Sequence, residues 1–214
     1  MAETITVFYG AATHNDAQAV SLRRDAPLRL SDGPYPFAEP PDLIRLATTA
    51  ARLDFLREHL QSLCGLWTKP PLAFLDVYFA WTGATLAAAP AQTTLTAAGQ
   101  GLFAPEDWNF AAPRPLPSAL LPAGDVTIRT DFAFWTGAGF VAVELPGERR
   151  AQRRSELARL VTAGVTVIEL APADLADAAA LGAKLPPEFA VFWRGVKLPQ
   201  SPFGARDLTI VATR

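Results

Sequence analysis

Two carboxylates, Asp131 and Glu144, stand inside stretches that are otherwise built for burial. Residues 126–135 and 140–145 are rich in β-branched and aromatic residues, and the short stretch Thr-Gly-Ala-Gly separates them. If the two runs form a hairpin in which Trp135 pairs with Phe140, the same register brings Asp131 directly opposite Glu144. Directly opposed Cβ atoms on neighbouring strands lie about 5 Å apart. The two acids are therefore predicted to share one face of a sheet.

Two like charges at that distance repel each other, and partial burial increases the cost. A divalent cation bound by both carboxylates would offset this repulsion, and hard oxygen ligands suit Mg²⁺ or Mn²⁺. Two other interpretations stay open at this point. A register shifted by one residue would place the acids on opposite faces, and a pair on a solvated face needs no metal.

The elements around the acids follow from the sequence pattern. Residues 126–135 and 140–145 read as strands, residues 147–164 as a helix that ends at Gly164, and residues 165–170 as a third strand. The order strand, strand, helix, strand predicts a mixed sheet with a crossover helix. The fold class expected from this pattern is α/β, or α+β by stricter counting.

This layout resembles the PD-(D/E)XK nuclease superfamily, and in particular its very-short-patch-repair-like branch. The resemblance covers residues 125–175, where an Asp on one strand is followed by an apolar strand that ends in Glu, then a glycine, an Arg-rich helix and another strand. It implies a restriction-endonuclease-like core that acts on DNA. It also implies that Asp131 and Glu144 are catalytic residues and ligands of Mg²⁺ or Mn²⁺.

The chain departs from the superfamily at the third motif position, where the usual Lys is replaced by Pro146. The resemblance implies that this Lys positions or activates the attacking water, and proline has no group for that task. Arg149 and Arg153 are close in sequence, but a guanidinium stays protonated and cannot act as a base. Either the metal alone generates the hydroxide, or the site is catalytically inactive.

Four arginines follow Glu144 at helical spacing, and these are Arg149, Arg150, Arg153 and Arg154. Cations in the first turn of a helix oppose the helix dipole, so helix stability does not favour them there. A nucleic-acid backbone beside the metal site would explain them as phosphate ligands. The other interpretation is a solvated basic face with local pairs to Glu148 and Glu156.

Three more residues with reactive side chains are expected to take no part in the chemistry. Glu169 on the third strand and Glu58 on the long helix are interpreted as facing solvent. Cys64 is interpreted as a buried, inert thiol, because neither histidine is linked to it by a motif.

The rest of the chain suggests one domain of residues 1–214, with a mainly helical N-terminal elaboration in 1–110 and the nuclease-like core in 111–214. Residues 5–10 read as a short strand that ends at a glycine. Residues 42–64 and 71–83 read as helices, and the proline-rich residues 103–125 read as loop.

The bulk composition narrows the classes of protein. The chain has 214 residues, a net charge of −2 and one cysteine, so an intramolecular disulfide is impossible and any nucleic-acid site needs a local basic patch. No signal peptide is visible. The most apolar stretch, residues 70–90, is interrupted by Asp76 and predicts a buried helix and not a membrane span. We expect a soluble cytoplasmic protein.

The leading hypothesis is a Mg²⁺- or Mn²⁺-dependent endonuclease-like phosphodiesterase that acts on DNA. The alternative is a nuclease-like fold that lost catalysis and serves as a nucleic-acid- or protein-binding module, which Pro146 and the slightly acidic composition favour. A third possibility is an unrelated fold in which the two acids never meet. No feature of the sequence indicates an oligomeric state.

Overall fold

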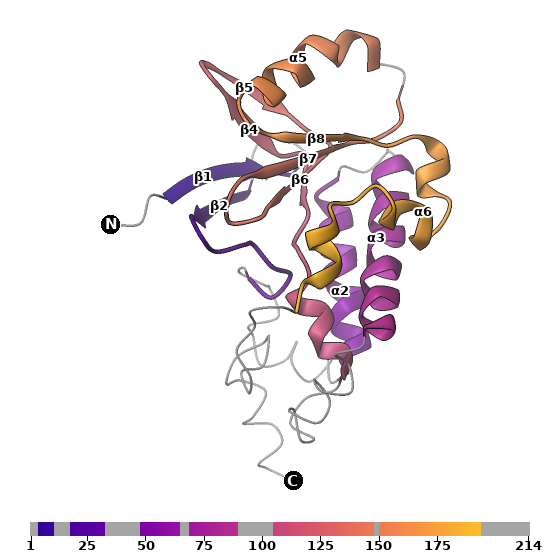
Figure 1. The fold of residues 1–214 in the computed structure, drawn as a ribbon. Helices are drawn as coiled ribbons and strands as arrows, with labels where there is room; N and C mark the ends of the chain where they lie inside the picture. Colours follow the sequence, from indigo (N-terminus) through magenta and orange to yellow (C-terminus); the bar gives the residue numbers. More distant parts are fainter. Residues whose placement is uncertain are drawn as a thin grey trace.

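The computed structural model describes residues 4–10, 18–32, 48–64, 69–89, 105–147 and 150–193 of the chain. Within these ranges the chain forms two four-stranded sheets with helices packed beside them (Figure 1). The expected α+β class, with a mixed sheet and flanking helices, is confirmed. The strands are divided between two sheets, where the sequence pattern predicted one.

The first sheet is antiparallel and has the order β2-β1-β4-β5. Its strands are β1 (Thr4–Tyr9), β2 (Gln18–Arg23), β4 (Leu120–Ala123) and β5 (Val126–Arg129). The strand predicted over residues 5–10 is confirmed, and Gly10 follows it with a φ of 100°. Two strands from the N-terminal half thus join two strands from the C-terminal half.

The second sheet has the order β3-β6-β7-β8. Its strands are β3 (Leu116–Pro117), β6 (Phe132–Trp135), β7 (Phe140–Glu144) and β8 (Thr166–Glu169). β6 and β7 are antiparallel, and Trp135 pairs with Phe140 as predicted. The sequence-based register of this hairpin is therefore confirmed.

Helix α5 (Arg150–Thr162) connects β7 to β8. The two strands it joins are parallel and adjacent, with Glu144 in register with Glu169. A parallel pair requires such a crossover because the chain must return to the same end of the sheet. The predicted order of strand, strand, crossover helix and strand is confirmed.

One hairpin runs through both sheets. β4 pairs with β5 and β3 pairs with β6, and the register is the same in both pairings. Between them the ladder continues through Thr130 N to Ala119 O and Ser118 N to Asp131 O, each 2.8 Å. Ser118 has a φ of 49°, in the left-handed region, so the ribbon bends there. The prediction of one strand over 126–135 is wrong in this respect, because the bend divides the arm at Thr130 and Asp131.

The prediction that residues 103–125 are loop is also wrong. This segment contains a 3-10 helix, η2 (Pro105–Ala111), as well as β3 and β4. Proline is tolerated here because it stands where a strand N–H is not needed. Pro117 lies on the edge strand β3, and Pro122 lies beyond the single residue pair that joins β4 to β1.

The predicted helices of the first half are present as α2 (Thr49–Ser62) and α3 (Lys69–Ala88), and residues 42–47 of the first prediction lie outside the described residues. Thr48 caps α2 by accepting a hydrogen bond from Ala51 N at 3.2 Å. α3 packs against α2 and against α6 (Ala178–Gly182). In the part of the chain that the structure describes, no helix has the length and apolar character needed to cross a membrane.

The two faces of the second sheet have different neighbours. Phe132 and Phe134 of β6 face α3, where Phe132 contacts Phe74 with ring centroids 4.5 Å apart. Because side chains alternate along a strand, Asp131 and Ala133 lie on the other face. α5 lies on the far side of β6, β7 and β8 from α2 and α3 (Figure 1). The buried apolar residues of both halves of the chain belong to one core.

The turn between β6 and β7 depends on a glycine. Gly137 has a φ of +89°, and a Cβ at this position would lie 3.0 Å from Pro27 N and 3.1 Å from Ala26 N. Its carbonyl also accepts a hydrogen bond from Asp25 N at 2.9 Å. The segment after β2 therefore lies directly against this turn.

We predict that Gly137→Ala lowers the free energy of unfolding by roughly 2 to 3 kcal/mol, through backbone strain and the clash with the 26–27 backbone. Gly124→Ala is the matched control, because Gly124 also has a positive φ, +69°, but no described neighbour lies within 4 Å of the place that its new methyl group would take. The control should cost about 1 kcal/mol. Urea unfolding gives the loss of unfolding free energy in each variant. Equal losses in the two variants would contradict the proposed clash between a Cβ at residue 137 and the backbone of residues 26–27.

Candidate functional site

Asp131 and Glu144 line the same groove, at the end of the β6–β7 hairpin opposite the turn. The groove has a volume of about 890 Å³. The residues that matter for its chemistry are Asp131, Glu144, Arg129, Arg153, Pro146 and Cys64. They come from the bend between β5 and β6, the end of β7, the start of α5 and the end of α2.

Asp131 is positioned by the bend of the long hairpin and by the end of β7. Its Oδ2 accepts a hydrogen bond from Leu145 N at 2.7 Å, across the hairpin. Its own carbonyl accepts from Ser118 N. The residue is partly buried, so its carboxylate lies at the border between the core and the groove.

Glu144 is the most deeply buried acid of the site, with 3% of its surface exposed. Its backbone is held in the ladder to β8, since its carbonyl accepts from Leu170 N at 2.9 Å. Its carboxylate is met by Arg153 of α5, with Nη1 2.5 Å from Oε2 and Nη2 3.4 Å from Oε1. Both carboxylate oxygens therefore face one guanidinium, a fork geometry that suits this pair.

Arg153 makes further contacts that hold it in place. Its Nη2 donates to the carbonyl of Arg129, and its Nε lies 3.5 Å from Glu156 Oε2. The guanidinium thus connects α5 to both β5 and β7. The repulsion expected between Asp131 and Glu144 is offset in this structure by Arg153.

The environment still favours the neutral form of Glu144. The pKa of Glu144 is raised to about 7, mainly by burial and then by the nearby Asp131 carboxylate, while the Arg153 guanidinium and the backbone of Asp131 oppose the rise. Glu169 adds a smaller upward contribution. A carboxyl group with this pKa exchanges a proton near neutral pH, which is the range that acid–base chemistry requires.

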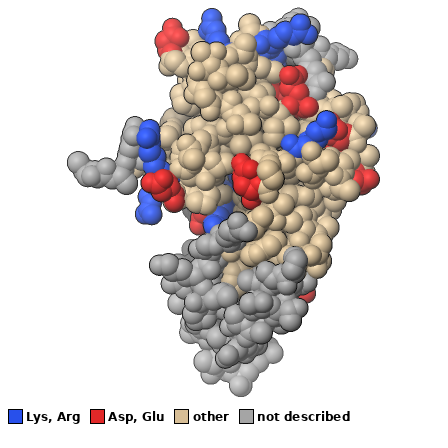
Figure 2. Space-filling view, in the orientation of Figure 1, with Lys and Arg blue, Asp and Glu red and all other residues tan. Residues whose placement is uncertain are grey.

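The four arginines expected to bind phosphate have different positions. Arg153 points to Glu144, whereas Arg154 is exposed. Arg150 begins α5, but its side chain and the whole of Arg149 lie outside the described residues. Among the described residues, the Lys and Arg side chains in the upper part of Figure 2 are interspersed with Asp and Glu and form no continuous basic surface in this view.

Arg129 is a groove residue that the sequence pattern did not single out. It lies on β5, two positions before Asp131, and it is exposed. No hydrogen bond or ion pair of its guanidinium occurs with any part of the described structure. The signal was present in the sequence, since Arg129 precedes Asp131 on the same hairpin arm, but the bend that forms the groove was not predictable.

Glu169, Glu58 and Cys64 lie in the environments that the sequence predicted for them. Glu169 and Glu58 are exposed, as predicted, although Glu169 also contributes to the charge around Glu144. Cys64 is buried, and burial, followed by the Asp131 charge, raises the pKa of its thiol to about 12. At neutral pH this cysteine is a thiol and a poor nucleophile.

The site offers a metal two carboxylates. Among the described residues, no group of three or more His, Cys, Asp and Glu side chains gathers in a way that could hold a metal ion. Mg²⁺ is commonly bound by one or two carboxylates together with waters and substrate phosphates, so the pair Asp131 and Glu144 fits such an ion in donor type and number. The fit requires Arg153 to leave Glu144, because both oxygens of that carboxylate face the guanidinium.

No family model, no curated protein and no solved structure matches this chain.

We predict that the stability of the wild-type protein falls as pH rises from about 5 to about 8. Glu144 has a higher pKa folded, about 7, than its ordinary value of 4.5, so the folded state binds the proton more tightly in this window. The glutamine of the Glu144→Gln variant does not titrate. The free energy of unfolding of this variant, taken relative to that of wild type, should therefore rise by roughly 2 to 3 kcal/mol between pH 5 and pH 8.

Urea unfolding at a series of pH values measures this difference. Glu58→Gln, on the exposed face of α2, controls for the chemistry of the substitution. If the stability difference between Glu144→Gln and wild type is the same at pH 5 and pH 8, burial does not govern the titration of Glu144.

Proposed function

We propose that this protein is a metal-dependent phosphodiesterase that acts on DNA, built on a restriction-endonuclease-like core. The observation that carries the proposal is the arrangement of the β6–β7 hairpin, whose register brings Asp131 and Glu144 into one groove. A crossover helix and a parallel strand follow, in the order that the resemblance implies.

Asp131 and Glu144 would hold Mg²⁺ or Mn²⁺ between the bend and the end of β7. When bound there, the metal supplies a water of lowered pKa and offsets the charge of a phosphodiester. The protein's own contribution is to orient the carboxylates. Leu145 N fixes Asp131, and the ladder to β8 fixes the backbone of Glu144.

The cations in and near the groove divide into two groups. Arg153 neutralises Glu144 when no substrate is present, and its release would leave a guanidinium beside an incoming phosphate. Arg129 and Arg154 are exposed, and we propose them as contacts of the DNA backbone together with Arg149 and Arg150. Phosphate contacts of this kind position a nucleic acid and do not read its sequence.

Two observations favour a second candidate, a nuclease-like module that binds nucleic acid or protein without cleaving. Pro146 lies in the groove at the position where the resemblance expects a Lys. The Glu144–Arg153 ion pair also satisfies the buried carboxylate without a metal. Both candidates use the same groove, so experiments on metal and on DNA separate them.

Millimolar Mn²⁺ should raise the melting temperature of the wild type and not that of the Asp131→Asn plus Glu144→Gln variant. At one hundred times Kd, binding to the folded state alone adds about 2.7 kcal/mol. Arg153→Ala should bind Mn²⁺ more tightly than wild type, because it removes the cation that competes for Glu144. Thermal melts with and without Mn²⁺ measure both effects, and nicking of supercoiled plasmid measures catalysis.

The outcomes separate the two candidates. A metal-dependent shift together with nicking that the double variant loses supports the phosphodiesterase. A shift without nicking supports the binding module, and Pro146→Lys is then the variant that tests the missing base. A wild type that shows no shift, with an Arg153→Ala variant that shows none either, contradicts the metal site.

DNA affinity should fall steeply with salt, and replacing Arg129 and Arg154 with Ala should flatten that dependence. Each lost phosphate contact reduces the slope of log affinity against log salt by about one unit. Arg159→Ala, nearer the C-terminal end of α5 and so further from Glu144 along the helix, is the control and should leave the slope unchanged. Fluorescence anisotropy with a labelled duplex at several salt concentrations gives the slopes. An unchanged slope in the double variant would mean that these arginines only face solvent.

A further inference from the structure

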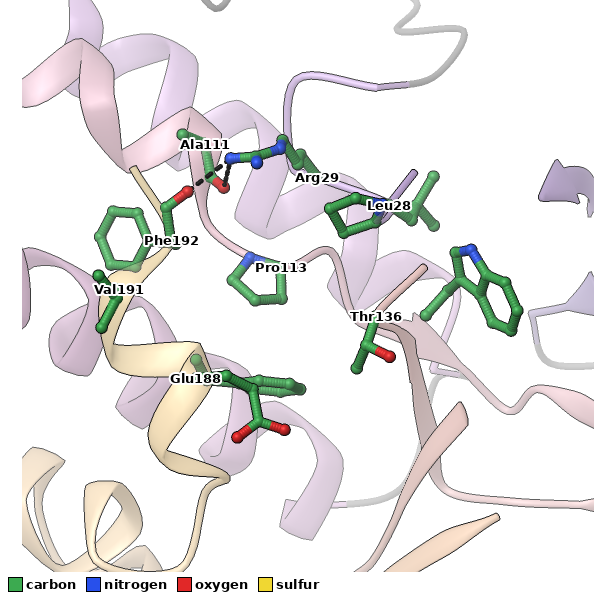
Figure 3. Close-up of a pocket in the computed structure, with 11 residues that line it drawn as sticks. Leu28, Arg29, Ala111, Pro113, Thr136, Glu188, Val191 and Phe192 are labelled. Carbon is green, nitrogen blue, oxygen red and sulfur yellow. Dashed lines mark hydrogen bonds between the residues drawn. The ribbon is translucent and has the colours of Figure 1, made fainter. Parts of the chain in front are cut away.

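A second cavity lies at the other end of β6, away from the groove. Its volume is about 290 Å³, and it is lined by the segment after β2, the segment after η2, the end of β6, and η4 (Pro187–Val191) with the residue that follows it (Figure 3). Asp131 precedes β6 and Trp135 ends it, so this one strand connects the two sites. The cavity plays no part in the proposed function.

The walls of this cavity are braced by hydrogen bonds within the protein. Arg29 Nη1 donates to Ala111 O at 3.1 Å and to Phe192 O at 2.5 Å, and so ties two walls together. Leu28 N donates to Trp135 O at 3.1 Å and joins a third wall. A small-molecule site of this kind is usually largely formed before the ligand arrives.

Most of the lining is apolar or aromatic. Leu28, Trp135, Phe189 and Phe192 are all buried, with exposed fractions between 2% and 7%. Pro113 lies between Arg29 and Glu188 in the view of Figure 3. Such walls suit a flat or aliphatic body and reject a strongly hydrated one.

The polar side chains of the lining have partners, with one exception. Trp135 Nε1 donates to Arg23 O at 3.0 Å, and Thr136 Oγ1 donates to Gly139 O at 3.0 Å. Arg29 is bound to the two carbonyls named above. Glu188 is exposed, and its carboxylate makes no hydrogen bond or ion pair with any part of the described structure. The Glu188 carboxyl group therefore remains available to accept hydrogen bonds from a ligand.

We propose that this cavity binds a small organic cation, with a flat aromatic body between the apolar walls and an amidinium or ammonium group on Glu188. A carboxylate forms its strongest hydrogen bonds with charged donors. Neighbouring aromatic rings also favour a cation over an anion. Arg29 lies at the opposite end of the cavity in Figure 3, where its Nη1 is held by two carbonyls and the nearby Asp32 carboxylate acts on its charge.

Isothermal titration calorimetry with three ligands of one shape tests the charge preference. Benzamidine, benzamide and benzoate share a ring and differ in carrying a positive, zero or negative charge. Wild type should bind benzamidine about tenfold more tightly than benzamide, as expected when a neutral hydrogen bond is replaced by a charge-assisted one. Benzoate should bind most weakly.

Substitutions in the cavity lining test whether the ligands bind in this cavity. Glu188→Gln should bind benzamidine and benzamide about equally, while Glu58→Gln, an exposed acid on α2, should keep the tenfold preference. Val191→Trp should weaken both ligands by filling the cavity. If wild type binds none of the three, prefers benzoate, or keeps its preference for benzamidine in Glu188→Gln, the proposal is overturned.

Discussion

The hairpin formed by residues 116–135 is the constraint on which the rest of this structure depends. It keeps one register from β3 and β6 through β4 and β5, so it belongs to both sheets. The bend at Ser118 sends its two ends to different partners, β1 on one side and β7 on the other. Asp131 stands at that bend, and the groove exists because the ribbon changes direction there.

The buried carboxylate of Glu144 is the most costly feature that this arrangement creates. An ionised group with 3% exposure needs a partner of opposite charge and good geometry. Arg153 provides it from α5, which is itself placed by the parallel pairing of β7 and β8. Removing only one partner of such a pair destabilises the folded protein more than replacing both partners, because one charge is then left buried. The same pair also gives the groove a state in which its acid is neutralised without a metal.

The short strand β6 lies between the two proposed sites. One of its faces packs Phe132 and Phe134 on α3, and the other lies toward α5. Asp131, just before β6, lines the groove, and Trp135 at the end of β6 lines the second cavity. A rigid strand buried on both faces is a suitable support for two sites, because its residues have little freedom to move.

The sequence by itself determined the local elements near the acids. Alternating and β-branched residues specified β7 and β8, the Arg-rich helix between them was predicted, and the Thr-Gly-Ala-Gly turn set the register that opposes Asp131 to Glu144. These features depend on neighbours in the chain, and local patterns report them.

Only the tertiary structure decided the bend at Ser118, the strands in the proline-rich segment, the choice of Arg153 as partner of Glu144 and the groove position of Arg129. Each of these depends on contacts between residues distant in sequence, and propensity carries no information about such contacts.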